Sequence, residues 1–530
     1  MNGAQAVVRA LEEQGVTVVF GYPGATVCPL YDQLAHSGIR HILVRQEQNA
    51  GHGASGYARI SGRPGVCLAT SGPGATNLIT ALATAYMDSI PLVAITGQVA
   101  SDLLGRDVFQ EADITGAVAP FIKYAYLVKE PADLPRVMGE AFLLAGTGRP
   151  GPVLVDIPVD VLLGELDWKD PGPIQIRGYR PAGRGHQGQV RRVAEAIQEA
   201  KRPLLCAGGG VFASPGGVEA LRAFSRESGL PVVTTMMGLG ALPSADPLSL
   251  GMLGMHGSPR ANQAVAQADL LLIVGARVGD RAVSAVAVER TKIVHIDIDP
   301  AEIGKNIGTA IPLVGDAATV LGQLRELHPQ AGGTGWWKEL SCRRPPRRGT
   351  GLDPQGVFAC LSRRLEKDAV FVADVGQNQI WAANWLEIRE GRFLTSGGMG
   401  TMGYAIPAAL GAQLAAPHRQ VVAVCGDGSF QMTMNELATS VQHQIPLKLI
   451  VMNNHTLGLV REIQTNSFGD RRFGVDLGAV PDIPAIAGAY GIPARRIAED
   501  SQVEEGVRWL LETPGSCLLE CQVDREEASH

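Results

Sequence analysis

The sequence lacks the features that mark secreted, membrane-spanning or zinc-binding proteins. Its eight cysteines are scattered and form no CxxC pair, so neither a disulfide framework nor a zinc site is indicated. No apolar run reaches the roughly 20 residues that span a bilayer. The first residues form a helical pattern that contains Glu12 and Glu13, which is not typical of a signal sequence. We therefore expect a reduced, cytoplasmic protein that does not enter a membrane.

An excess of basic charge is also missing. The chain has 46 Lys and Arg against 52 Asp and Glu, a net charge of −6 and a pI near 6.0. A nucleic-acid partner is therefore not expected. With 45% hydrophobic and only 18% charged residues, the 530 residues are typical of a well-buried globular protein. That length favours about three domains of roughly 150–200 residues each.

Short apolar runs alternate with helix-like segments along the whole chain. We predict strands over residues 16–20, 66–70, 92–96 and 153–158, then 203–210, 231–235, 270–277 and 293–300, and finally 370–376, 421–428, 447–454 and 517–523. Continuous apolar strands between helices indicate parallel sheets that are covered on both faces. The predicted fold class is therefore α/β, with three doubly wound parallel-sheet domains.

Two stretches rich in Pro and Gly divide the chain. We expect domains over residues 1–166, 190–330 and 352–530, joined by linkers over residues 167–189 and 331–351. In parallel sheets of this kind, ligands bind beyond the carboxyl ends of the strands.

The segment GDGSFQMTMNELATSVQHQIPLKLIVMNN places two polar strand ends on either side of one helix. Asp427 follows the first strand and Asn454 follows the second, so both should lie at the same sheet edge. A carboxylate and an amide oxygen suit Mg²⁺, and the amides of Gly428 and Ser429 would favour phosphate oxygens. A turn or a strand-end cap would explain either piece alone. Both pieces at this spacing favour a metal and diphosphate site.

A second candidate lies in RQEQNAGHGASGYAR, where Glu47 follows the short strand HILV and opens a small-residue helix. By itself, an acid at a helix start is explained by the helix dipole. Together with a diphosphate site, Glu47 becomes a candidate buried catalytic acid.

The GDG and NN pair across one helix resembles the thiamine diphosphate-binding motif of the thiamine-dependent carboligases and decarboxylases. The resemblance implies metal ligation by Asp427, Asn454 and the carbonyl of Thr456, and a catalytic role for Glu47 at the cofactor's pyrimidine ring. It makes residues 1–166 the pyrimidine-binding domain and residues 352–530 the diphosphate domain. The further cofactor contacts that it implies are Pro23, Gly24 (also catalytic), Gly376, Gln377, Asn378, Gly400, Met402, Gly426, Gly428, Ser429, Leu457, Gly458 and Leu459.

Longer stretches, such as FGYPGATVCPLYD and GQVASDLLGRDVFQEAD, resemble the acetohydroxyacid (acetolactate) synthase family. That resemblance implies a substrate-channel pair, Phe109 and Gln110, the latter also catalytic. It makes the middle domain an FAD-binding domain with a structural flavin, although loss of the flavin from a retained domain is an alternative. The implied FAD contacts are Arg149, Gly209, Met255, His256, Gly275, Arg277, Asp280, Asp297 and Asp316.

Three features depart from that family. Val159 stands where Lys is typical at the channel mouth, and Ile463 stands where a Trp favours 2-ketobutyrate as acceptor. The sequence stops at VDREEASH, without the extended arm that covers the site in the family, so we expect a wetter site or closure by other loops. Arg281 is retained and would hold the acceptor's carboxylate.

The implied reaction is decarboxylation of a 2-oxo acid such as pyruvate and addition of the remaining two-carbon unit to a second carbonyl. Two pyruvates giving 2-acetolactate and CO₂, in branched-chain amino-acid or acetoin-type metabolism, is the leading case. The alternative is another thiamine diphosphate and FAD enzyme (a carboligase, decarboxylase or C–C hydrolase) with a different acceptor or a diketone substrate. A non-catalytic relative would be expected to lack Glu47 or Asp427, and both are present. The resemblance also implies a homodimer or homotetramer, with a regulatory small subunit as a further partner.

Overall fold

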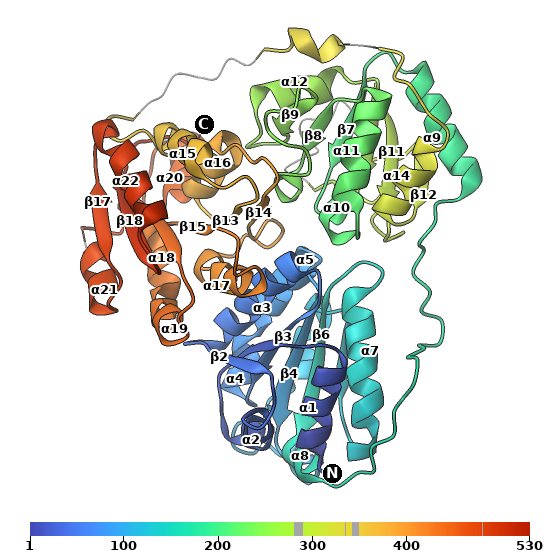
Figure 1. The fold of residues 1–530 in the computed structure, drawn as a ribbon, viewed down its shortest axis with the longest axis vertical. Helices are drawn as coiled ribbons and strands as arrows, with labels where there is room; N and C mark the ends of the chain where they lie inside the picture. The colour runs from blue at the N-terminus through green and yellow to red at the C-terminus, as the bar shows by residue number, and fades with distance from the viewer. Residues whose placement is uncertain (280–289, 334, 342–348, 480, 530) are drawn as a thin grey trace.

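The computed structural model describes residues 1–279, 290–333, 335–341, 349–479 and 481–529. Figure 1 shows three lobes: the N-terminal one at the bottom, the middle one at the upper right and the C-terminal one at the upper left. Each lobe contains one six-stranded sheet, and the strands of the described residues pair in parallel in all three sheets. Three α/β domains with parallel sheets were predicted, and this prediction is confirmed.

The N-terminal sheet has the strand order β2-β1-β3-β4-β6-β5. Its strands are β1 (Val18–Gly21), β2 (Arg40–Leu43), β3 (Gly65–Ala69), β4 (Leu92–Gln98), β5 (Tyr124–Leu127) and β6 (Pro152–Pro158). Its helices are α1 (Gly3–Glu13), α2 (Cys28–Leu34), α3 (Glu47–Ser61), α4 (Pro73–Asn77), α5 (Ile79–Met87), α6 (Ile114–Val118), α7 (Leu134–Gly146) and α8 (Val159–Leu163).

The middle sheet has the order β12-β11-β10-β7-β8-β9. Its strands are β7 (Pro203–Ala207), β8 (Val232–Thr234), β9 (Ser249–Met252), β10 (Leu270–Val274), β11 (Lys292–Asp297) and β12 (Ile311–Val314). Its helices are α9 (Gln187–Glu199), α10 (Gly210–Ala213), α11 (Gly217–Ser228), α12 (Pro259–Gln267) and α14 (Ala317–Arg325). Helix α9 therefore begins within the stretch that was expected to be linker.

The C-terminal sheet has the order β14-β13-β15-β16-β18-β17. Its strands are β13 (Val370–Ala373), β14 (Arg392–Leu394), β15 (Val421–Gly426), β16 (Lys448–Asn453), β17 (Ala494–Ile497) and β18 (Cys517–Gln522). Its helices are α15 (Pro354–Arg364), α16 (Gln377–Trp385), α17 (Ala405–Ala415), α18 (Asp427–Thr433), α19 (Leu437–Gln442), α20 (Gly458–Ser467), α21 (Ile483–Ala489) and α22 (Val503–Glu512).

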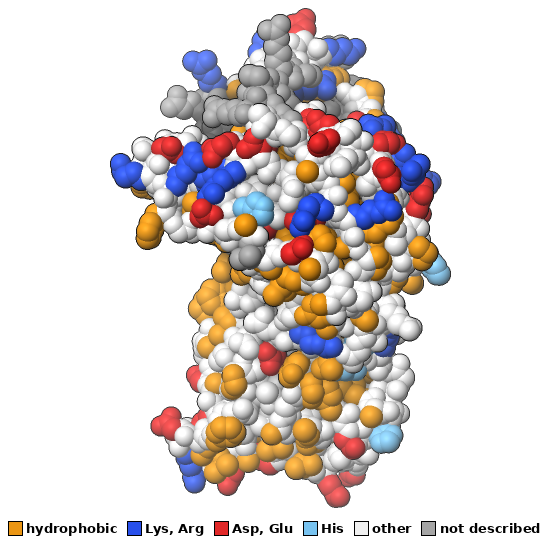
Figure 2. All heavy atoms as spheres, turned by 90° about the vertical axis from the view of Figure 1, so that its left-hand side faces the viewer, with side chains coloured by type: hydrophobic (Ala, Val, Ile, Leu, Met, Phe, Trp, Pro, Cys, Tyr) orange, Lys and Arg blue, Asp and Glu red, His pale blue; other side chains and the backbone are white. Residues whose placement is uncertain are grey.

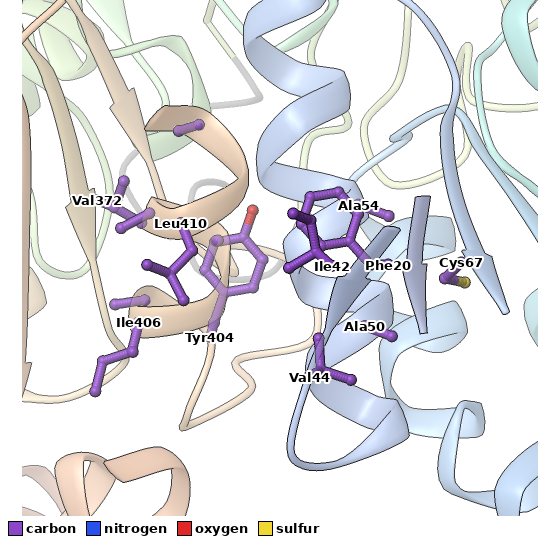
Figure 3. Close-up of a cluster of buried hydrophobic side chains, with 14 of the residues drawn as sticks. Phe20, Ile42, Val44, Ala50, Ala54, Cys67, Val372, Tyr404, Ile406 and Leu410 are labelled. Carbon is purple, nitrogen blue, oxygen red and sulfur yellow. The ribbon is translucent and has the colours of Figure 1, made fainter. Parts of the chain in front are cut away.

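The N-terminal and C-terminal sheets share one hydrophobic core. Because strand residues alternate between faces, Val18 and Phe20 of β1 turn toward this core while Val19 packs on the opposite face of the sheet. Val372 of β13 enters the same core from the C-terminal sheet. Figure 3 shows the ring of Tyr404, which immediately precedes α17, reaching toward α3. Its hydroxyl lies 3.0 Å from Ser55 Oγ.

Helices α3 and α17 meet between the two sheets, and their contact depends on glycine. A Cβ atom on Gly56 of α3 would lie 2.0 Å from the carbonyl oxygen of Ala408, and one on Gly411 of α17 would lie 1.9 Å from that of Gly53. The two backbones therefore touch, which places the N-terminal and C-terminal strand ends in a fixed relation.

One predicted helix differs from the structure. A single helix was expected between β15 and β16. The structure has two, α18, which begins at Asp427, and α19, and a 3₁₀ turn over Met434–Glu436 separates them. Glu436 at this turn is fully buried, and its carboxylate accepts hydrogen bonds from Asn49 Nδ2 (2.9 Å) and Thr439 Oγ1 (2.6 Å) that offset the cost of burial.

Two further expectations concern cysteine and the membrane. Six of the cysteines within the described residues are buried and Cys28 is exposed, all with free thiols, as expected for small core residues. Within the described ranges, none of the helices combines the length and apolar character that crossing a membrane requires.

Candidate functional site

The turn after β3, residues 70–74, is where the predicted site residues of the N-terminal domain meet. A Cβ atom on Gly24 would lie 2.5 Å from Thr70 Cβ, and one on Gly72, whose φ is +57°, would lie 3.0 Å from Gln110 Cα. Such distances are too short for any residue with a side chain, so glycine allows both approaches. Gly24, which follows Pro23, is therefore packed against Thr70. Gln110 is packed against Gly72 of the same turn.

Glu47 is the first residue of α3 and faces the same turn. Its Oε2 accepts a hydrogen bond of 2.9 Å from Asn77 Nδ2, at the end of α4. A Cβ atom on Gly74 would lie 3.3 Å from Oε1, so the absent side chain leaves room beside this second oxygen. The carboxylate is only partly buried in the single chain, less than expected. Asn77 was not predicted, and its only signal was its place at the end of the stretch TSGPGATN.

The predicted metal ligands lie at the carboxyl ends of two neighbouring strands. Gly426 of β15 pairs with Met452 of β16, so Asp427 and Asn454 follow adjacent strand ends, as predicted. The carboxyl group of Asp427 is 4% exposed, and burial raises its pKa to about 6. Among the described residues no Lys, Arg or His forms an ion pair with it. A buried carboxylate in this setting fits a bound cation.

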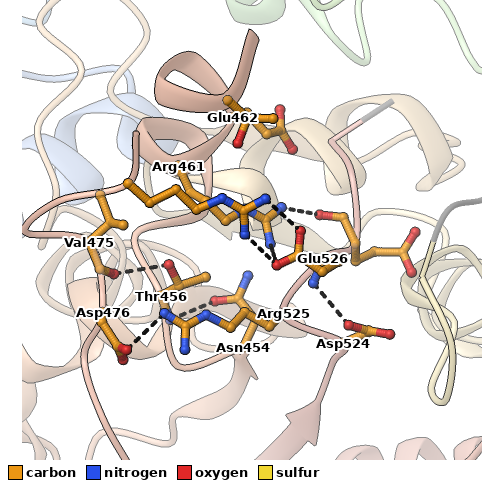
Figure 4. A network of polar contacts seen from close by, with 12 residues as sticks. Asn454, Thr456, Arg461, Glu462, Val475, Asp476, Asp524, Arg525 and Glu526 are labelled. Carbon is orange, nitrogen blue, oxygen red and sulfur yellow. Dashed lines mark hydrogen bonds and ion pairs between the residues drawn. The ribbon is translucent and has the colours of Figure 1, made fainter. Parts of the chain in front are cut away.

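The oxygen donors around Asp427 are of the kind that would fit Mg²⁺. No group of three His, Cys, Asp or Glu side chains in the described part of the chain is arranged to hold a metal ion. One carboxylate, the amide oxygen of Asn454 and a backbone carbonyl would instead give the few hard oxygen ligands that Mg²⁺ takes when phosphates and water complete its octahedron. Thr456 is buried, and its backbone N–H lies 3.3 Å from Asn454 Oδ1 (Figure 4).

The remaining residues predicted for the diphosphate surround these ligands. Asn454 Nδ2 donates to Gln377 Oε1 at 2.8 Å, and Ser429 Oγ accepts from the amide of Gly426 at 3.1 Å. The glycines show how close the segments lie. A Cβ atom added to Gly458 would meet the side chain of Gln377, and one added to Gly426 would meet that of Asn378. A Cβ atom added to Gly428 would meet the side chains of Leu457 and Met402. Gly376 directly precedes α16 and Gly400 lies in the loop between β14 and α17, with φ values of 150° and 70°. Leu459 is the second residue of α20.

Residues 524–529 lie against the helices that border this site. Trp381 Nε1 of α16 donates to the carbonyl of Ala528 at 2.8 Å, and Arg461 Nη2 of α20 donates to that of Glu527 at 2.8 Å. Figure 4 shows Arg461 turned toward Glu526 and Arg525 turned toward Asp476. This segment therefore covers one side of α16 and α20.

The two halves of the predicted site are not joined by polar contacts within the described residues of one chain. Among the described residues no hydrogen bond or ion pair joins Glu47 or Gln110 to Asp427, Asn454 or Thr456. Besides its contact with α17, the start of α3 meets the C-terminal domain at Glu436. Oε1 of Glu436 accepts from the amide of Arg45, two residues before the helix, at 2.8 Å and from Asn49. The sequence offered no signal for this buried acid beyond its place in a helical pattern.

A cavity of about 690 Å³ opens where the three domains meet. Its lining includes every described residue predicted to contact FAD: Arg149, Gly209, Met255, His256, Gly275, Arg277, Asp297 and Asp316. Asp280, also predicted, lies outside the described residues. The N-terminal domain adds Asp88 and Ser89 and the C-terminal domain adds Gly397 and Gly398, none of which was predicted. The volume is that of a typical cofactor pocket.

Close backbone contacts and ion pairs shape this cavity. A Cβ atom on Gly208 would lie 2.2 Å from the carbonyl oxygen of Gly275, so the turns after β7 and β10 touch directly. Arg149 Nη1 lies 2.7 Å from Glu302 Oε1 and 3.2 Å from Asp299 Oδ2, and thereby ties the N-terminal domain to the middle one.

The residues predicted for the substrate lie on separate elements. Phe109 is 87% exposed in the loop after β4, Ile463 is 54% exposed on α20, and Val159 is the first residue of α8. Arg281 lies outside the described residues. Their contribution to one substrate pocket stays a prediction.

Comparisons with known proteins agree with the predicted fold and family. Three family models match the chain: the N-terminal TPP binding domain of thiamine pyrophosphate enzymes over residues 1–117, the central domain of these enzymes over 190–324, and their C-terminal TPP binding domain over 374–521. Thiamine pyrophosphate is the same compound as thiamine diphosphate.

Relatives from three organisms match almost the whole chain. An acetolactate synthase of Mycobacterium bovis is 47% identical over 524 residues, which cover 95% of this chain and 85% of the relative. An acetolactate synthase large subunit of Corynebacterium glutamicum is 46% identical over 95% of this chain and 83% of its own length. A probable acetolactate synthase large subunit of Methanocaldococcus jannaschii is 42% identical over 100% of this chain and 93% of its own length. The chain therefore belongs to the thiamine pyrophosphate enzymes, in the family of the acetolactate synthases.

Proposed function

We propose that the protein joins two molecules of pyruvate to form 2-acetolactate and CO₂. The bond between the carboxyl and carbonyl carbons of one pyruvate breaks, and its two-carbon remainder forms a bond to the carbonyl carbon of the second. The observation that carries the proposal is the buried Asp427 carboxylate beside Asn454, which fits a magnesium diphosphate site in a chain that also presents Glu47. The relatives' name, acetolactate synthase, supports the choice of product.

Asp427, Asn454 and the carbonyl of Thr456 would hold Mg²⁺. The diphosphate would lie between the 376–378 segment and the amides of Gly428 and Ser429 at the start of α18. When bound, thiamine diphosphate supplies the electron sink that makes loss of CO₂ from a 2-oxo acid feasible.

Glu47 would hold and exchange a proton with the cofactor's pyrimidine ring. Its Oε2 is fixed by Asn77, while Oε1 faces the space beside Gly74. A carboxyl group that is anchored at one oxygen keeps the other in a constant position, which is what general acid–base chemistry requires.

Substrate recognition would come from different loops. Gln110 and Phe109 would line the approach of pyruvate, and Arg281 would bind the carboxylate of the acceptor in the bidentate way that guanidinium groups allow. Val159 and Ile463 give this pocket an aliphatic character. A difference of one methylene changes binding by only about 1–3 kcal/mol, so we expect weak discrimination between pyruvate and 2-ketobutyrate as acceptors.

The cavity between the three domains would hold FAD as a structural cofactor. Its volume and the predicted residues that line it support this part of the proposal. The test is the flavin absorbance of the purified protein, and of the protein after incubation with FAD and removal of unbound ligand. Protein that retains no flavin would contradict it.

We further propose a homodimer or homotetramer in which each active site uses two chains. Figure 2 shows one face on which hydrophobic side chains gather across the middle and lower parts while charges gather above. Large apolar side chains such as Phe473, Phe468 and Met432 are exposed in the single chain. The name "large subunit" of several relatives supports a smaller regulatory chain as a further partner.

The activity is tested by incubating the purified protein with pyruvate, thiamine diphosphate and Mg²⁺, with and without FAD, and measuring acetolactate. Formation of acetolactate with release of one CO₂ per product supports the proposal. CO₂ release without acetolactate, or turnover only when another carbonyl compound is added, would replace it with a related carboligase or decarboxylase.

A further inference from the structure

We infer that Glu462 and the segment 524–529 orient the metal ligand Asn454 by acting through Gln377. Gln377 and Glu462 are then positioning residues of the metal site. This inference rests on the proposed magnesium site, and it concerns interactions that link α16, α20 and residues 524–529 of this chain.

The side-chain amide of Gln377 has one allowed orientation. Its Nε2 lies 2.5 Å from Glu462 Oε1 and 2.8 Å from the carbonyl oxygen of Glu527. An ionised carboxylate and a carbonyl can only accept hydrogen bonds. A rotated amide would place Oε1 against both acceptors and lose two hydrogen bonds, so Nε2 must face them and Oε1 must point the other way.

This orientation determines that of Asn454. Gln377 Oε1 can only accept, and it lies 2.8 Å from Asn454 Nδ2. The Asn454 amide therefore turns its nitrogen toward Gln377 and its Oδ1 toward the opposite side, where the oxygen also meets the amide of Thr456 at 3.3 Å (Figure 4). Since Mg²⁺ binds oxygen and not an amide nitrogen, the correct side of Asn454 is presented to the cation.

The two acceptors are themselves held in place. The amide and the hydroxyl of Ser529 each donate to the Glu462 carboxylate at 2.7 Å. The carbonyl of Glu527 also accepts from the buried guanidinium of Arg461 at 2.8 Å, a charge-assisted bond. Because Arg461, Glu527 and Ser529 are buried, rearranging them would leave polar groups without partners, which is costly.

Gly458 leaves the space that this arrangement needs. A Cβ atom there would lie 1.8 Å from Gln377 Oε1, so any larger residue would push the Gln377 amide away from Asn454. The first residue of α20 is therefore matched to the side chain that orients the ligand.

Two substitutions of Glu462 separate acceptor capacity from charge. Glu462→Gln and Glu462→Met both remove the charge and keep a long side chain. The Gln oxygen can still accept from Gln377 Nε2 and from the Ser529 amide, while its NH₂ group donates to the Ser529 hydroxyl, which can also act as an acceptor. Met offers no comparable acceptor, so only the Glu527 carbonyl still holds Gln377 Nε2 and the preference for this amide orientation weakens.

The experiment titrates Mn²⁺ against each protein at saturating thiamine diphosphate and follows free Mn²⁺ by electron paramagnetic resonance. We expect Glu462→Met to bind Mn²⁺ about 10-fold more weakly than the unmodified protein, at the lower end of the range for groups behind a metal ligand. Glu462→Gln should bind close to normally. Flavin content and the thermal unfolding midpoint report whether each variant is folded.

The possible results are distinguishable. If the unmodified protein binds no Mn²⁺ with thiamine diphosphate, the proposed metal site is wrong. If it binds Mn²⁺ and Glu462→Met binds equally well, the metal site stands and the positioning role is overturned. If Glu462→Met does not fold, Ser529→Ala, which removes one bond to Glu462, should weaken Mn²⁺ binding in the same direction by a smaller factor, and unchanged binding would overturn the inference.

Discussion

At the scale of single residues, the hydrogen bond from Asn77 makes Glu47 directly testable. In Glu47→Gln the amide oxygen can still accept from Asn77 Nδ2, so the side chain should keep its place. It cannot exchange a proton, so we expect the rate of acetolactate formation to fall about 10²–10⁴-fold. Binding of thiamine diphosphate with Mg²⁺, measured by calorimetry, should change little.

Asn77→Ala is the matched control for this substitution. It leaves the Glu47 carboxyl group but frees Oε2, so its activity should fall by a smaller factor than that of Glu47→Gln. Full activity in Glu47→Gln would remove Glu47 from the mechanism, whatever the cofactor binding shows.

Asp156 in β6 gives a prediction on pH. Its Oδ1 accepts from Thr96 Oγ1 (2.6 Å) and its Oδ2 from Gln98 Nε2 (3.0 Å), yet burial raises its pKa from 3.8 to about 7. The folded protein therefore binds this proton more tightly than the unfolded chain does. The associated stability is present below about pH 4 and is lost as the pH rises through about 7.

Asp156→Asn should therefore stabilise the protein at pH 8, by up to a few kcal/mol (~1.4 kcal/mol per pKa unit). Asn can donate to the Thr96 hydroxyl and accept from Gln98, so both contacts survive. The difference in Tm between variant and unmodified protein should grow from pH 5 to pH 8. A difference that is constant with pH would show that Asp156 does not titrate in this range.

The same scale shows what sequence can and cannot reveal about a site. Glu47 and Asp427 were predictable because each stands in a short pattern with a chemical meaning. Asn77 and Glu436 were not, because an amide at the end of a turn and an acid in a helical stretch have no distinctive neighbours. Their positions become meaningful only when α3, α4 and the C-terminal domain come together.

At the scale of elements, strand prediction succeeded in the sheet centres and was weakest at the edges. The four central strands of each sheet were all predicted, since both of their faces are buried and their residues are continuously apolar. Of the six edge strands only β2 was noticed. Strands such as β17, with the sequence ARRI, and β5 are partly exposed, so they carry no continuous apolar run.

The contact between α3 and α17 predicts opposite effects for two Gly→Ala substitutions. In Gly56→Ala the new methyl group would meet the backbone of Ala408, so the helices must separate. We expect a loss of about 1–3 kcal/mol, as for other overpacked cores. Gly488 lies exposed in α21 with nothing within 4 Å of its Cβ position, and Gly488→Ala should be neutral or stabilising by up to about 1 kcal/mol.

Thermal or denaturant unfolding of both variants checks this comparison. Equal stability of Gly56→Ala and the unmodified protein would mean that the two helices are not packed at backbone contact.

At the scale of the whole molecule, the parts of the proposed active site are divided between domains. Glu47 belongs to the N-terminal domain and Asp427 to the C-terminal one, and within the described residues of one chain they share no hydrogen bond or ion pair. Glu47, at the start of α3, is only partly buried, and an apolar, charge-poor region occupies part of the face in Figure 2. Both features are expected if a second copy of the chain completes each site.

Complementation between two inactive variants tests this division. Glu47→Gln and Asp427→Asn should each be inactive alone. In a two-fold dimer with shared sites, a mixed pair has one site with both substitutions and one site with neither. Random mixing by refolding or co-expression makes half of the dimers mixed, so about a quarter of the unmodified activity should return. Mixtures that stay inactive, although mass spectrometry detects mixed dimers, would mean that each site is built from a single chain.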